Sequence, residues 1–93
     1  MAEAIDVDER AAGRFTVTVG SGRSATTHDV TVDAAWAAGL VGDTVPAADL
    51  VRASFAFLLE REPKEAILRR FELTVIGRYF PEYEREIARR MAS

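Results

Sequence analysis

The sequence predicts an α+β fold in which an N-terminal two-stranded antiparallel β-hairpin is followed by about four short helices packed around a central helix. Two observations lead to this class. Residues 14–32 contain two runs in which apolar and polar residues alternate, as in half-buried strands. Residues 49–91 carry many large apolar side chains at helical spacing, and Pro63 and Pro81 divide this stretch into consecutive helices.

Length and N-terminal composition predict the domain organisation. A chain of 93 residues suits one domain, and we assign a single α+β domain to residues 14–93. Residues 1–13 are polar and rich in alanine, and they show no pattern beyond Ile5 and Val7. This segment is predicted to be a flexible leader.

The hairpin is predicted from two segments of alternating character. In residues 14–19, phenylalanine and valine alternate with threonine, and residues 26–32 place His28, Val30 and Val32 on one face. The glycine-rich segment between them is interpreted as a long, mobile hairpin loop. Because an isolated hairpin is marginal in water, we expect it to lie on the helices or to gain strands from a partner.

Two helices are predicted to follow the hairpin. Asp33 is a suitable N-cap for a short helix that ends near Gly39 or Gly42. The helix that begins at Asp49 has apolar residues over well over half of its circumference. So wide an apolar surface predicts a central helix that is contacted on more than one side.

The C-terminal third is predicted to be helical as well. One helix is predicted to begin at Pro63, a further turn near Thr74, and a last helix at Pro81. The apolar stripe of the helix after Pro63 consists of Ile67, Leu68 and Phe71. The stripe of the last helix consists of Tyr83, Ile87 and Met91.

The composition excludes several classes of protein. The absence of cysteine excludes disulfides, thiolate metal sites and cysteine nucleophiles. The N-terminus lacks the basic region of a signal peptide, and no apolar run approaches the roughly 18 residues of a membrane span. We therefore expect a cytoplasmic protein that does not enter a membrane. The arginine-rich, asparagine-free and glutamine-free composition is typical of a small bacterial protein from a GC-rich genome.

Two motifs resemble catalytic or nucleotide-binding features without meeting their requirements. The loop with Gly20 and Gly22 has the glycine spacing of a dinucleotide-binding motif, but a strand follows it instead of a helix N-terminus. His28 is the only histidine, and its place in the alternation predicts a packed, structural side chain that Asp29 on the opposite face cannot orient. We therefore predict no catalytic, cofactor-binding or metal-binding residues, no cofactor, and a protein that is not an enzyme.

The charged side chains of the C-terminal half are interpreted as a salt-bridged outer surface. The acidic clusters offer too few convergent oxygens for a metal site made of carboxylates. Six arginines are interleaved with glutamates, which dilutes any positive field: Arg69, Arg70, Arg78, Arg85, Arg89 and Arg90. The net charge of −3 likewise does not indicate strong attraction to nucleic acid, so contact of these arginines with phosphate is the less favoured interpretation.

Residues 26–60 resemble the strand–helix–helix order of the ribbon–helix–helix repressors. Those proteins dimerise by pairing their strands and read the DNA major groove with outward strand side chains. The resemblance implies a DNA-binding transcriptional regulator in which Thr27, Asp29 and Thr31 contact the bases.

The function we predict from the sequence is that of a small non-enzymatic module for protein–protein interaction or self-association. Unpaired edges of the hairpin invite pairing across a two-fold axis, and the helix from Asp49 has more apolar surface than a small helical monomer easily covers. A protein partner is therefore expected, with a homodimer included. A transcriptional regulator of ribbon–helix–helix type is the alternative.

Overall fold

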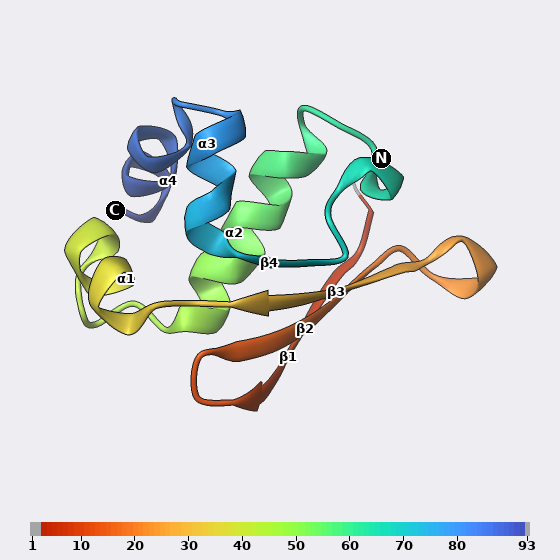
Figure 1. Ribbon diagram of the computed structural model, residues 1–93, viewed down its shortest axis with the longest axis horizontal. Coiled ribbons are helices and arrows are strands. Elements are labelled where there is room, and N and C mark those ends of the chain that lie inside the picture. Colours follow the sequence, from red (N-terminus) through yellow and green to blue (C-terminus); the bar gives the residue numbers. More distant parts are fainter. Residues whose placement is uncertain (1–2, 93) are drawn as a thin grey trace.

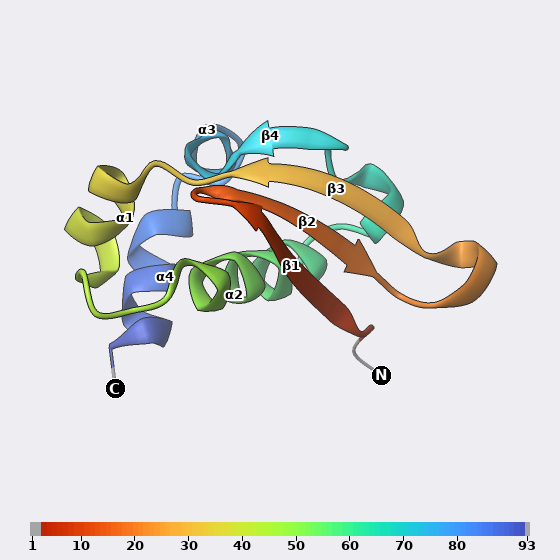
Figure 2. The same ribbon diagram turned by 90° about the horizontal axis from the view of Figure 1, so that it is seen from below.

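A computed structural model describes residues 3–92, within which a four-stranded sheet is combined with four α-helices. The strand order is β1-β2-β3-β4; the first two pairings are antiparallel and β3 pairs with β4 in parallel. Helices α2, α3 and α4 lie on one side of the sheet (Figure 1), and Figure 2 looks onto its other face. The α+β class is therefore confirmed.

The elements follow one another along the chain without long gaps. The strands are β1 (Ile5–Ala11), β2 (Arg14–Val19), β3 (Thr26–Thr31) and β4 (Arg70–Glu72). The helices are α1 (Ala34–Val41), α2 (Ala47–Leu59), α3 (Ile76–Tyr79) and α4 (Tyr83–Met91). Short 3-10 turns span Gly22–Ser24, Lys64–Ala66 and Leu73–Val75.

The two predicted strands are present as β2 and β3. Their register pairs Phe15 with Val30 and Val17 with His28, and buried residues alternate with more exposed ones along both strands. The two-stranded description was wrong, however, because β1 and β4 extend the sheet on either side. The outer edge of β2 is therefore occupied by β1, and the outer edge of β3 is occupied by β4 over residues 29–31.

The segment predicted as a flexible leader contains strand β1. Ile5 and Val7 pair with β2 and pack against the core, so even a sparse alternation is sufficient for a strand when a neighbour offers a free edge. Lys64 fixes the start of the segment through its ammonium group, which donates hydrogen bonds of 2.9 and 3.1 Å to the Glu3 carboxylate. The first two residues of the predicted leader lie outside the described part of the chain.

The helix predicted from Pro63 is replaced by a 3-10 turn and an extended segment. After the turn, β4 runs parallel to β3, with Phe71 opposite Val30 and the Asp29 amide donating to the Arg69 carbonyl over 2.7 Å. The backbone groups of this segment find their partners in β3 instead of in a helix of their own. The apolar spacing that predicted a helix is thus overridden by tertiary pairing.

The other predicted helices are observed close to their expected positions. The Asp33 carboxylate accepts a 3.0 Å hydrogen bond from the Trp36 amide and caps α1. Helix α2 contacts β1, α1 and α4, and it buries Leu50, Val51, Ser54, Phe55, Phe57 and Leu58. The core thus lies between the inner face of the sheet and α2, and it continues to α4, where Tyr83 and Ile87 are buried.

Candidate binding groove

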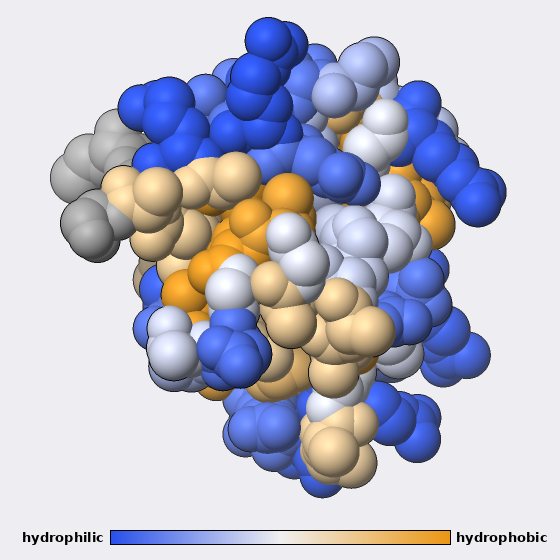
Figure 3. All heavy atoms as spheres, turned by 90° about the vertical axis from the view of Figure 1, so that its left-hand side faces the viewer, coloured by the Kyte–Doolittle hydropathy of each residue, from blue (hydrophilic) through white to orange (hydrophobic). Residues whose placement is uncertain are grey.

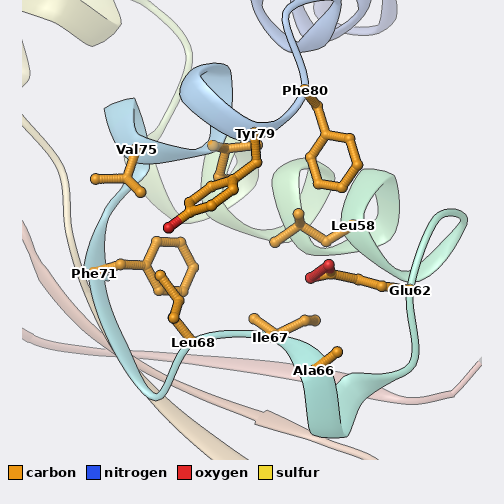
Figure 4. A pocket seen from close by; sticks show the side chains of 10 residues that line it. Leu58, Glu62, Ala66, Ile67, Leu68, Phe71, Val75, Tyr79 and Phe80 are labelled. Atoms are coloured by element: carbon orange, nitrogen blue, oxygen red, sulfur yellow. The ribbon is translucent and has the colours of Figure 1, made fainter.

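An apolar groove opens where the end of α2, the segment from Ala66 to Phe71, and α3 meet (Figure 4). We call it the α3 groove; its volume is about 300 Å³. Leu58 lies on the α2 side, and Tyr79 and Phe80 lie on the α3 side. The remaining walls are formed by Glu62, Ala66, Ile67, Leu68, Phe71, Val75 and Ile76.

The local sequence explains why these side chains surround a hollow. Pro63 follows the end of α2. Because proline has no backbone N–H, it cannot continue the hydrogen-bonding pattern of the helix, and the chain turns and becomes extended toward β4. Ile67 and Phe71 then face the core and are buried, whereas Leu68 faces outward. Helix α3 is a single turn, which leaves Tyr79 at its exposed end.

The groove carries the two most exposed large apolar side chains of the described residues. Leu68 is 47% exposed and Tyr79 is 66% exposed. Single exposed apolar residues are normal on any protein surface. Two of them at the mouth of one apolar hollow form a contiguous patch, and such patches mark interaction sites.

Charged groups of both signs accompany this patch. The Glu62 carboxylate points into the groove (Figure 4), and it takes part in no ion pair or side-chain hydrogen bond with any other residue between 3 and 92. Arg69 and Arg78 are the chain neighbours of Leu68 and Tyr79, and both are exposed. Neither arginine is ion-paired within the described chain. The groove itself thus offers one acid, and two exposed arginines are the chain neighbours of its exposed apolar residues.

His28 supports the floor of the groove from inside. Its ring is fully buried and is hydrogen-bonded at both nitrogens, with Nδ1 2.8 Å from the Leu68 carbonyl and Nε2 2.9 Å from the Thr26 hydroxyl. Burial lowers the pKa of His28; the bond to Leu68 raises the pKa, and the nearby Arg69 charge lowers it further. The predicted packed position of His28 is confirmed. Its hydrogen bond to the Leu68 carbonyl was not predicted.

A second apolar surface lies on α1. Its eight residues are all uncharged and none of them is buried, although a helix that is apolar on every side is normally enclosed. Figure 3 shows this side of the molecule, where apolar atoms are bordered by hydrophilic ones. The exposed positions are small, as at Ala35, Ala38 and Gly39, so the surface lacks both projections and charges.

The side chains implied in DNA readout lie on the open face of the sheet. Thr27, Asp29 and Thr31 are exposed there, and Asp29 lies 3.8 Å from the guanidinium of Arg70. Strand β3 has β2 on one side and β4 on the other over residues 29–31. An intermolecular ribbon of the repressor type needs a free strand edge, which β3 does not offer at these positions.

The C-terminal arginines divide into two groups. Arg70, Arg89 and Arg90 form ion pairs, as the predicted salt-bridged surface requires. Bonds from Arg89 and then Arg90 lower the pKa of Glu86 to about 2. The other three arginines in the predicted set, Arg69, Arg78 and Arg85, form no ion pair within residues 3–92.

Two further properties of the described residues bear on function. No three His, Asp or Glu side chains among residues 3–92 come together in the way that a metal ion would need. In the same part of the chain, every helix is too short or too polar to cross a membrane.

Sequence reasoning did not identify the α3 groove. It placed Leu68 in a buried helical stripe, whereas the residue is exposed at the groove mouth. The sequence carries only a weak signal for a strand here: Ile67, Phe71 and Leu73 are apolar at odd positions, but Arg69 interrupts the alternation.

Comparison of the chain with protein-family models, with curated proteins and with solved structures gave no match. The residues of the α3 groove and their surroundings are therefore the basis on which we infer a function.

Proposed function

We propose that this protein is a non-enzymatic protein–protein interaction module and that the α3 groove binds an apolar segment of a protein partner. One observation carries the proposal: the two most exposed large apolar side chains of the described residues, Leu68 and Tyr79, lie at the same apolar hollow. Exposed apolar groups of this kind lose contact with water when a partner covers them, which favours association.

The chemistry of the lining supports binding. Tyrosine is enriched among the residues that dominate interface energetics, and such anchors lie beside well-packed pockets. The groove is lined by apolar side chains apart from Glu62 and the Tyr79 hydroxyl, so one charged contact is available to orient a partner. Both ring nitrogens of His28 are engaged in hydrogen bonds, which leaves that side chain without a free lone pair or proton for acid–base work.

Selection from a random peptide library tests the proposal. Peptides are selected against the wild-type protein, and their affinities are measured by fluorescence polarisation for wild type, Leu68→Ser and Tyr79→Ser. Each groove variant should lose affinity by roughly tenfold or more, because truncating one anchor of an interface typically costs over 1 kcal/mol. Since both side chains are exposed, the variants should keep the circular dichroism spectrum and the melting temperature of the wild type.

Ala38→Ser on α1 is the matched control, since it changes an exposed apolar residue of the competing surface. It should leave peptide affinity unchanged. Peptides that bind wild type and both groove variants equally would refute the α3 groove as the binding surface.

A further inference from the structure

We infer that the occupant of the α3 groove is a second copy of this chain, in a two-fold symmetric dimer. The inference rests on the proposed function, because it names the partner of the same groove. A two-fold interface uses the same patch on both subunits, so that patch must be complementary to itself in shape and in charge.

The shape of the patch meets this condition. Tyr79 projects from the end of α3 and is 66% exposed, and the apolar hollow bounded by Leu58, Ile67 and Phe71 lies next to it. A projection and a hollow on one patch allow Tyr79 of each subunit to enter the hollow of the other. The exposed Leu68 side chains then cover the contact from its rim.

The charges meet the condition as well. Glu62 points into the groove, and Arg78, the residue before Tyr79, is exposed; neither forms an ion pair with any residue described. Across a two-fold axis, the entry of Tyr79 brings Arg78 of one subunit toward Glu62 of the other. Each contact occurs twice, and such pairs fix the orientation of an interface more than they add affinity.

The apolar surface of α1 is the competing place for a dimer contact, and it is less suited to that role. The helix carries no charged residue, and its exposed positions are small. It therefore provides neither an anchor side chain nor a charge pair that would select one orientation.

Sedimentation equilibrium over a hundredfold range of concentration tests the inference. The wild type should show twice the monomer mass at the upper concentrations. Tyr79→Ser removes an anchor from both halves of the interface, so its dissociation constant should rise roughly 100-fold or more. The control Ala38→Arg places a long cation on α1 and should leave the wild-type dissociation constant unchanged.

A charge exchange provides the second arm of the experiment. Glu62→Arg should raise the dissociation constant by about tenfold, because like charges then face each other across the axis. Adding Arg78→Glu to the same chain should restore the wild-type value. No simple loss of folding produces such a recovery, and circular dichroism of each variant confirms that it is folded.

The outcomes separate this inference from the function on which it rests. A wild type that stays monomeric but binds selected peptides at the α3 groove overturns the dimer and leaves the interaction module in place. A dimer that survives Tyr79→Ser and is broken by Ala38→Arg also overturns the inference, because α1 is then the interface. A monomer without peptide binding overturns both proposals.

Discussion

A buried hydrogen bond joins α2 to α4 and offers a sharp test of the core. The hydroxyl of Tyr83 lies 2.7 Å from Ser54 Oγ, and both side chains are fully buried. Ser54 Oγ also lies 2.8 Å from the Leu50 carbonyl, to which it donates its only proton. The Tyr83 hydroxyl must therefore be the donor in the first bond. Burial raises the pKa of Tyr83 to about 12.

This arrangement predicts unequal effects of removing the two partners. Ser54→Ala leaves the Tyr83 hydroxyl buried without an acceptor and should cost about 2 kcal/mol of the free energy of unfolding. Tyr83→Phe leaves Ser54 bonded to Leu50 and should cost only about 1 kcal/mol. In the double variant no polar group is left unpaired, so its cost should also be about 1 kcal/mol. Adding Tyr83→Phe to Ser54→Ala should therefore stabilise the protein.

Urea denaturation at pH 7 and one protein concentration measures these differences. With an m-value of about 1 kcal/mol/M for a chain of this size, Ser54→Ala should lower the midpoint by roughly 2 M. The double variant should recover about half of that loss. If the two single effects simply add in the double variant, Ser54 and Tyr83 are not coupled, and the contact between α2 and α4 is not the one described.

Two other predictions concern the sheet. Because the pKa of His28 is lowered in the folded state, the unfolded chain binds a proton first as the pH falls below 6.5. The free energy of unfolding should thus decline from pH 6.5 toward the folded pKa, and His28→Gln should show a flatter profile in urea titrations over that range. Gly13 and Gly22 both have positive φ, of 75° and 66°. Their surroundings differ: a Cβ added at Gly13 would lie 2.9 Å from the Val32 carbonyl oxygen, whereas a Cβ added at Gly22 would face open space. Gly22→Ala should cost about 1 kcal/mol and Gly13→Ala clearly more; equal midpoints in urea would contradict the tight turn between β1 and β2.

The parts of the fold that depend on local patterns were predictable. The alternation in β2 and β3 correctly placed His28 on the inner face, and Asp33 correctly marked the start of α1. The broad apolar surface from Asp49 also identified α2 as a helix with several neighbours. In each case the residues that determine the element lie within the element or next to it.

The parts that depend on distant partners were not predictable. Strand β1 has only two apolar residues facing the core, and it is stable because β2 offers a full row of backbone partners. Strand β4 has three residues, and its position follows from β3, about 40 positions earlier in the chain. The α3 groove was missed for the same reason, since its floor exists only when the segment before β4 is extended and Leu68 faces outward.

The parallel pairing of β3 with β4 has a consequence for the order in which the molecule folds. Val19 and Thr26, the closing pair between β2 and β3, are seven positions apart, whereas Val30 and Phe71 are 41 apart. Closing the larger loop costs about 1.5 kcal/mol more in chain entropy. The three N-terminal strands can thus form from local contacts, while β4 docks only after α1 and α2 have brought the chain back to the sheet. Since Leu68 and Phe71 belong to that segment, we expect the α3 groove to form after the three N-terminal strands, so that a newly made chain gains it late in folding.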